Sequence, residues 1–140
     1  MTRPALPTTR MLPELTAESQ DYWTGGAQGE FRVYRCRSCR GWIHPPTRGC
    51  WRCQSRDVGP EVASGRAKVA AYTINQHPWL EGFPPPYIVA IVEMDESPDV
   101  RFTTNIIECD VEDVHVGMPV EVVFEHRDDV WLPLFKPVAS

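Results

Sequence analysis

The sequence predicts a mainly β protein with an N-terminal helix, a four-cysteine metal module and a small C-terminal barrel of five strands. Three observations lead to this class. Four of the five cysteines lie close together, between residues 36 and 53. After Gly65, stretches rich in β-branched and aromatic residues are separated by Gly, Pro and Asp, as strands are separated by turns. The 14 prolines against 9 glycines favour turns and leave little room for long helices.

The N-terminal part is expected to form an extended arm followed by one short helix. Residues 1 to about 14 are rich in proline and threonine, which favours an extended chain. Thr16 fits the N-cap position of a helix that runs through residues 17–26, with Gly25-Gly26 weakening or stopping it. A strict capping box needs Glu or Gln three residues after the N-cap, where the sequence has Ser19.

Six later segments have the composition of β-strands. A short one, residues 29–36, leads into the first cysteine pair. The other five are residues 66–76, 87–95, 100–108, 119–127 and 130–137. Prolines limit the last of them to an edge or to partial pairing. Four or five strands in about 75 residues fit a small closed barrel better than a seven-stranded sandwich.

The clustered cysteines form two C-x2-C pairs, Cys36/Cys39 and Cys50/Cys53. Each C-x2-C turn places two sulfurs on one side of a metal ion, and two such turns complete a tetrahedron. Zinc is favoured, while a rubredoxin-like iron site, which uses the same four thiolates, stays open. Because protein ligands fill all four positions, the site is structural. His44 lies between the pairs as a competing ligand, but four cysteines suffice and we expect it to be a loop residue.

A strongly basic segment surrounds these cysteines. Residues 32–56 contain seven arginines and no acid, which leaves −12 on the rest of a chain whose net charge is −5. The arginines either offset the thiolate charge, bind the phosphates of a ligand such as coenzyme A, or bind nucleic acid. The candidates for these contacts are Arg37, Arg40, Arg48 and Arg52. Nucleic acid is the least favoured of the three, because the acidic barrel half would repel a phosphate backbone.

Two groups of aromatic side chains are candidates for a partner surface. The loop of residues 75–87 is long and apolar, and it contains Trp79, Phe83 and three consecutive prolines. It either folds over the end of the barrel as a lid or meets a protein partner or an acyl chain. Tyr22 and Trp23 on the N-terminal helix either pack onto the barrel or reach a neighbouring subunit. The residues leave both pairs of alternatives open.

The sequence contains no evident catalytic set. It has no Ser/His/Asp combination and no glycine-rich phosphate loop, and nothing in it would activate His77, Cys109 or His115. We expect Cys109 to be an ordinary buried or half-buried thiol. No stretch approaches the roughly 20 apolar residues that span a bilayer, and the N-terminus lacks the apolar core of a signal peptide. A cytoplasmic location is therefore expected, where paired cysteines indicate a metal site rather than disulfides.

Six segments occur in a recognisable order: "YW" on the helix, "GEFRVYRCRSCRGWIHPP", "CWRCQS", "SGRAKVAAYTI", "PPYIVAIVEMD" and "VGMPVEVVFE". In this combination they resemble the domain-of-unknown-function-35 family, over residues 16 to about 137. Many members of that family have Gly directly after the second cysteine and Pro inside the second pair. Here Arg40 precedes Gly41 and Trp51 replaces the proline, and neither change affects ligation.

The resemblance implies three parts: an N-terminal arm and helix (1–30), a rubredoxin-like zinc ribbon (31–60) and an OB-fold barrel (61–140). In this family the four cysteines hold structural zinc. The resemblance further implies an accessory subunit, not catalytic alone, that binds and activates a thiolase-superfamily enzyme acting on acyl-CoA thioesters. Such enzymes include steroid side-chain aldolases of the lipid-transfer-protein type, which are lyases, and thiolases or acyltransferases.

The expected partner is thus a thiolase-fold enzyme subunit, in a hetero-oligomer for which analogy indicates a two-plus-two arrangement. Partner contacts are expected at Tyr22, Trp23, Trp79 and Phe83, and a coenzyme A thioester is expected in the complex. No membrane association is expected. A zinc-ribbon/OB-fold protein that binds nucleic acid is the alternative, and salt-dependent binding to oligonucleotides would identify it.

Overall fold

The computed structural model describes residues 10–139, so the first part of the expected arm, residues 1–9, lies outside the described chain. The two helices are α1 (Gln20–Thr24) and the 3-10 helix η1 (Gly25–Gln28). The strands are β1 (Phe31–Cys36), β2 (Trp42–Ile43), β3 (Val58–Ala63), β4 (Arg66–Asn75), β5 (Tyr87–Met94), β6 (Ser97–Asn105), β7 (Pro119–Arg127) and β8 (Val130–Pro137). Neither helix of residues 10–139 has the length and apolar character needed to cross a membrane.

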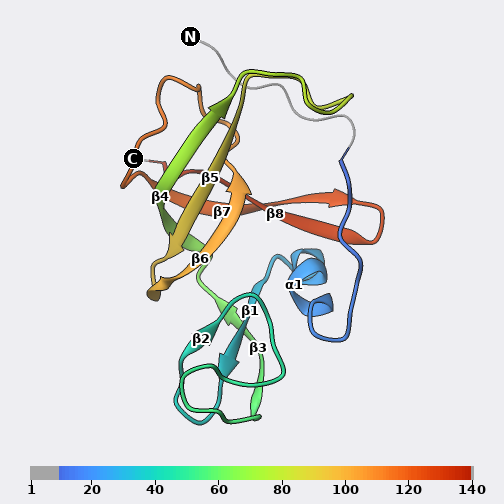
Figure 1. Cartoon of the computed structure of the whole chain (residues 1–140), viewed down its shortest axis with the longest axis vertical. Helices are drawn as coiled ribbons and strands as arrows, with labels where there is room; N and C mark the ends of the chain where they lie inside the picture. The colour runs from blue at the N-terminus through green and yellow to red at the C-terminus, as the bar shows by residue number, and fades with distance from the viewer. Residues whose placement is uncertain (1–9, 140) are drawn as a thin grey trace.

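The strands form two antiparallel sheets, one for each half of the chain. The small sheet has the order β2-β1-β3 and the large one the order β6-β5-β4-β7-β8. Figure 1 shows the small sheet and the cysteine turns at one end of the molecule, with the large sheet at the other and α1 beside both. The predicted fold class, mainly β with a short N-terminal helix, a cysteine module and a five-stranded OB-type sheet, is confirmed.

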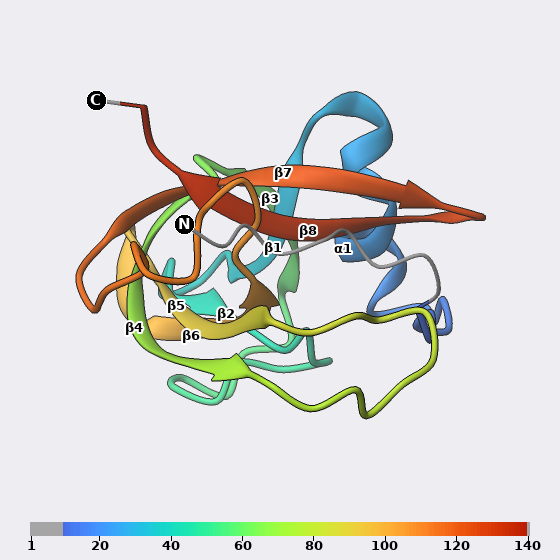
Figure 2. The same cartoon turned by 90° about the horizontal axis from the view of Figure 1, so that it is seen from above.

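The large sheet curls into a half-barrel, which Figure 2 shows from above. Its two outer strands, β6 and β8, meet through a single parallel bridge between Ile106 and Phe135. Next to this bridge, the Thr104 hydroxyl donates a hydrogen bond to the Pro133 carbonyl at 3.2 Å. The expected full closure is therefore replaced by a seam between β6 and β8, at which Pro133 has no N–H to donate and the Ile107 N–H donates to the Phe135 carbonyl at 2.8 Å.

The predicted strand 100–108 needs correction at its ends, whereas the predicted strand 130–137 has the bounds of β8. β6 begins at Ser97, three residues earlier than predicted, because Met94 pairs with Ser97 across a tight turn. β8 lies at the edge of the sheet as predicted, but it pairs with β7 along its whole length. The carbonyl of Pro133 points toward β6, and its nitrogen faces the same way, so the proline costs no hydrogen bond to β7.

The N-terminal helix is shorter than predicted, because α1 ends at Thr24 and η1 follows. In the turn before it, the Ser19 N–H donates to Thr16 Oγ1 and the Thr16 N–H donates to Ser19 Oγ, both at 3.1 Å. Serine thus supplies the reciprocal bond that Glu or Gln makes in a capping box. A Cβ at Gly26 would lie 2.5 Å from the Cβ of Trp131, so this glycine lets the helical segment pack directly on β8.

One continuous apolar core joins the barrel to the base of the small sheet. It includes Phe31 and Val33 of β1, Phe102 of β6 and Phe135 of β8. The Phe31 ring lies 5.1 Å from Phe102 and 5.9 Å from Phe135, in edge-to-face contacts. A second, much smaller cluster lies at the cysteine turns and contains Cys36, Ile43 and Cys50.

Candidate metal centre and partner surface

The four predicted metal ligands converge at the end of the small sheet. Cys36 ends β1, Cys39 follows in the next turn, and Cys50 and Cys53 lie on the turn before β3. Their sulfurs all lie within 4.8 Å of one another. Between the two turns, Cys36 Sγ is 3.6 Å from Cys53 Sγ and Cys39 Sγ is 3.7 Å from Cys50 Sγ. Both distances are far longer than the roughly 2.05 Å of a disulfide.

Backbone amides are directed at two of these sulfurs. The Cys39 N–H lies 3.5 Å from Cys36 Sγ, and the Arg52 N–H lies 3.4 Å from Cys50 Sγ. Mainly through backbone N–H groups, the pKa of Cys36 falls to about 6 and that of Cys50 is also lowered. The Ser55 N–H lowers the pKa of Cys53, but the neighbouring thiols outweigh it and raise that pKa to about 11. The close spacing of the thiols therefore opposes loss of the last proton.

This donor set fits zinc. An ion with four thiolate ligands at about 2.3 Å in a tetrahedron holds its sulfurs about 3.8 Å apart, close to the two separations above. His44 lies outside the cluster of the four cysteines. Its ring packs 4.5 Å from Phe102 and 4.9 Å from Tyr22, which places it between the small sheet and the barrel.

Each of the four predicted phosphate-binding arginines forms an ion pair within the chain. Arg37 lies 3.1 Å from Asp57, Arg40 3.0 Å from Glu61, Arg48 2.6 Å from Glu18 and Arg52 2.6 Å from Asp99. The acidic partners come from β3 and the turn before it, from the N-terminal segment and from β6. Acidic segments thus offset much of the basic charge around the cysteines.

Arg52 links the cysteine turn to the barrel. Its Nη1 donates to the Trp42 carbonyl at 2.7 Å, and its Nη2 donates to Asp99 Oδ2 at 2.6 Å. The guanidinium also lies 4.1 Å over the ring of Trp51, whose side chain is otherwise exposed. Arg52 is therefore held on three sides by its own chain, which the sequence did not indicate.

The two aromatic residues of α1 are both half-buried, and both line two cavities of about 360 and 440 Å³. The Tyr22 ring packs against Trp23, Phe31, His44 and Phe102, and burial raises the pKa of its hydroxyl. The helix thus packs onto the rest of the chain through Tyr22, and the partner contacts of both residues remain predictions.

The two candidate partner residues of the β4–β5 loop, Phe83 and Trp79, differ in their exposure. Phe83 is buried, with its ring 4.2 Å from Tyr87 and under the guanidinium of Arg10 at 4.9 Å. Trp79 is 70% exposed, and its Nε1–H donates to Asn75 Oδ1 at 2.9 Å. The loop is therefore anchored at Phe83 and presents Trp79 to solvent, and the partner contacts of both residues remain predictions.

The three residues weighed as catalytic candidates lie in separate places. The His77 ring lies 4.4 Å from that of Trp79. Cys109 is buried and its thiol is 3.3 Å from the Asp110 carbonyl, while His115 Nδ1 is 3.0 Å from the Asp113 carbonyl. Among residues 10–139, no hydrogen bond joins any two of the three candidates.

The sequence interpretation missed the segment before α1. Met11, Leu12 and Leu15 are exposed apolar residues there, and Arg10 is a partly buried cation. The signal was present as "RMLPEL", in which three large apolar side chains interrupt an otherwise proline- and threonine-rich stretch.

A four-thiol ribbon joined to a curled five-stranded OB-type sheet defines a zinc-ribbon/OB-fold protein. Residues 23–59 match the family described as "ChsH2, rubredoxin-like zinc ribbon domain", and residues 61–125 match "ChsH2, C-terminal OB-fold domain". The chain is 37% identical over 117 residues to the "DUF35 domain-containing scaffold protein" of Methanocaldococcus jannaschii, covering 76% of this chain and 80% of that one. The chain belongs to the DUF35 family.

Two further relatives come from larger assemblies. The chain is 30% identical over 129 residues to the "Probable enoyl-CoA hydratase alpha subunit" of Thermomonospora curvata, covering 91% of this chain but only 40% of that protein. A solved chain named "Ltp2-ChsH2(DUF35) aldolase" is 30% identical and superposes with a TM-score of 0.80, covering 90% of this chain and 98% of that one. The chain thus spans less than half of the hydratase subunit but nearly all of the aldolase-associated chain.

Proposed function

We propose that this protein is a non-catalytic accessory subunit that binds and activates a thiolase-superfamily enzyme acting on acyl-CoA thioesters. The observation that carries the proposal is the likeness to the solved chain named "Ltp2-ChsH2(DUF35) aldolase", which covers 90% of this chain and 98% of that one. Within residues 10–139, His77, Cys109 and His115 do not come together as a catalytic set. A steroid side-chain aldolase of the lipid-transfer-protein type is the first choice of partner enzyme, and a thiolase or acyltransferase is the second.

In this role zinc is structural. Cys36, Cys39, Cys50 and Cys53 hold the ion, leave no coordination position open, and fix the two turns at the end of the small sheet. Two structural neighbours of the ligands, Ser38 and Ser55, hydrogen bond through their hydroxyls at 2.9 Å and join the same two turns. The metal and this bond together hold the two turns in a single shape.

A coenzyme A phosphate contact is best supported at Arg48. Its side chain is 87% exposed, the highest value among the four candidate arginines. It lines a polar cavity of about 540 Å³ together with Trp51, Gln54 and Arg56. Arg56 is exposed and makes no ion pair within residues 10–139, so this cavity offers a second cation for a phosphate group.

The test is affinity purification of the tagged chain from its native host, followed by mass spectrometry and activity assays. We expect a thiolase-fold protein to copurify, and we expect acyl-CoA turnover in the complex but none in the isolated chain. Retro-aldol or thiolytic activity of the purified chain alone would contradict the proposal. For the phosphate contact, Arg48→Ala and Arg56→Ala should raise the KM for acyl-CoA in the complex without changing the KM for CoA-free substrates.

A further inference from the structure

The segment before α1 and the β4–β5 loop meet at Arg10, and both carry exposed apolar side chains. The guanidinium of Arg10, at the start of the segment, lies 4.9 Å over the ring of Phe83 in the loop. Among the large apolar side chains, Met11 is 88% exposed, Leu12 36% and Leu15 38%, while Trp79 is 70% and Leu80 49% exposed. We call the surface of these five residues the strap–loop face. An apolar surface of this kind marks a site of protein interaction.

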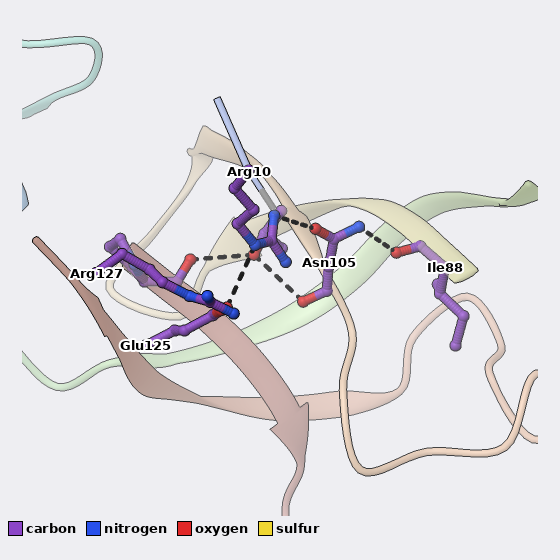
Figure 3. A network of polar contacts seen from close by, with 7 residues as sticks. Arg10, Ile88, Asn105, Glu125 and Arg127 are labelled. Atoms are coloured by element: carbon purple, nitrogen blue, oxygen red, sulfur yellow. Dashed lines mark hydrogen bonds and ion pairs between the residues drawn. The ribbon is translucent and has the colours of Figure 1, made fainter. Parts of the chain in front are cut away.

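A partly buried network of polar contacts centred on Arg10 joins the start of the segment to the barrel (Figure 3). Arg10 Nη1 donates to Asn105 Oδ1 of β6 at 3.1 Å, and its Nε lies 3.3 Å from Glu125 Oε2 of β7. The same guanidinium lies 4.9 Å over Phe83 of the loop. Asn105 in turn donates to the Ile88 carbonyl of β5 at 2.8 Å. Segment, loop and barrel are thus joined at one side chain, so the face above it has a fixed shape.

Contacts within the β4–β5 loop also hold the Trp79 side chain in place. Asn75 accepts a hydrogen bond from Trp79 Nε1 at 2.9 Å and donates one to the His77 carbonyl at 2.6 Å. The His77 ring covers one side of the Trp79 ring at 4.4 Å. An exposed tryptophan held in one orientation loses little conformational entropy when a partner covers it.

Two unpaired carboxylates border the face. Glu14 lies on the segment and Glu81 on the loop, and both are exposed. Neither forms an ion pair with any residue between 10 and 139, whereas Asp57 and Glu61 of the ribbon both do. A surface that is apolar in its centre and negative at its border complements an apolar pocket with Lys or Arg at its border.

We propose that the strap–loop face is the surface through which this protein docks on the thiolase-fold subunit. The partner presents there an apolar pocket for Trp79, a groove for Met11 and Leu12, and a basic border facing Glu14 and Glu81. This inference rests on the proposed function for the identity of the partner. It assigns the docking contact to the N-terminal segment and the loop, and it leaves the cysteine turns outside the contact.

The experiment measures the affinity of purified variants for the thiolase-fold subunit recovered in the pull-down. Trp79→Ala and Met11→Glu should each weaken binding about tenfold or more, as expected for central interface residues. Trp51→Ala is the matched control for Trp79, because Trp51 is 63% exposed on the cysteine turns. Val116→Glu is the control for Met11, because Val116 is 64% exposed on a different loop. Both controls should change affinity less than about twofold.

The charged border is tested separately. The double variant Glu14→Lys/Glu81→Lys should weaken binding several-fold, more at low than at high salt, whereas Asp113→Lys should not. Arg10→Gln should lower affinity and raise hydrogen exchange in residues 11–15 and 76–86 together. Exchange that rises in one segment alone would show that Arg10 does not join the two.

The possible failures are distinguishable. If the wild-type chain recovers no thiolase-fold protein, the proposed function fails. If it recovers one and Trp79→Ala binds it as tightly as wild type, the strap–loop face is not the docking surface. Loss of binding in Trp51→Ala would place the contact on the cysteine turns. A wild-type homodimer that Trp79→Ala dissociates would assign the face to a second copy of this chain. Bound zinc and melting temperature check that each variant is folded.

Discussion

The ribbon and the half-barrel are stabilised by different means. At the cysteine turns the buried apolar cluster contains only Cys36, Ile43 and Cys50, with Tyr34 and Val58 packed against it. The larger core is continuous and joins Phe31 at the base of the small sheet to Phe102 and Phe135 of the barrel. The cysteine turns bury too little apolar surface to fold without a cross-link, whereas the barrel folds through burial. In one chain, therefore, the cysteine turns depend on the metal for folding and the barrel depends on its apolar core. Each change described below should affect one of these two regions more than the other.

Removing a metal ligand should have the largest effect, and it should be confined to the ribbon. Cys36→Ser is expected to abolish zinc binding and unfold the turns, because zinc binding supplies on the order of 10 kcal/mol to the folding of such modules. Zinc analysis and amide NMR spectra measure both effects, with β4 to β8 expected to keep their signals. Cys109→Ala is the control, because Cys109 lies on the barrel side and outside the cluster of four. Cooperative loss of the barrel signals would show that the two regions fold as one unit.

Truncating a core residue of the barrel should do the opposite: it should destabilise the barrel and leave zinc bound. Phe102 is 2% exposed and contacts Phe31, so Phe102→Ala should cost about 3–5 kcal/mol of unfolding free energy while one zinc per chain is retained. Chemical denaturation and zinc analysis check the two parts. Ile91→Ala is the control on the same sheet, because Ile91 is partly exposed and its truncation should cost far less. A loss of zinc in folded Phe102→Leu would contradict the separation.

The difference between the two regions also decides what the sequence could predict. Ligands two residues apart in a C-x2-C turn are local, so the metal site followed from spacing alone. The strands of the barrel followed from composition, and β7 was predicted with the bounds that the structure has. The seam between β6 and β8 was not predictable in this way, because Ile106 and Phe135 meet only after the sheet has curled.

The arginines around the cysteines are a second case in which the sequence did not predict the contacts. Their number and positions were evident, but their partners are distant in sequence, as with Arg52 and Asp99, which are 47 positions apart. Local composition carries no information about such pairs, because the tertiary fold brings them together. The same holds for Arg10, whose contact with Asn105 spans 95 positions. The sequence therefore did not predict the strap–loop face as one surface, although it did indicate Trp79 as a candidate for a partner contact.

Acid should weaken the junction between the two regions through His44. Burial lowers the pKa of this imidazole to about 4, from its ordinary 6.5. The unfolded chain therefore takes up the proton first, so the His44 contribution to stability is present above about pH 6.5 and is lost as the pH falls toward 4. The loss is at most roughly 3 kcal/mol, since each pKa unit corresponds to about 1.4 kcal/mol.

A matched variant isolates this effect from acid release of zinc. His44→Phe keeps a ring against Tyr22 and Phe102 and removes the titrating group. It also removes Nδ1, which is buried without a hydrogen-bond partner in the described chain, so the variant should be at least as stable as wild type at pH 7. The measurement is the difference in unfolding free energy between variant and wild type, which should grow in favour of the variant from pH 7 to pH 4.5. A difference that does not depend on pH would refute the assignment, and His115→Gln on an exposed loop serves as the control.

The smallest effect is expected at the ion pair that joins ribbon and barrel. Arg52 and Asp99 approach to 2.6 Å, but the Asp99 side chain is 57% exposed, so the pair should contribute no more than about 1 kcal/mol. A double-mutant cycle with Arg52→Ala and Asp99→Ala measures that coupling. Arg52→Ala alone should cost more than Asp99→Ala alone, because Arg52 also donates to the carbonyl of the buried Trp42 at 2.7 Å. Equal costs for the two single variants would mean that the bond to Trp42 adds nothing and that Arg52 connects the two regions through charge alone.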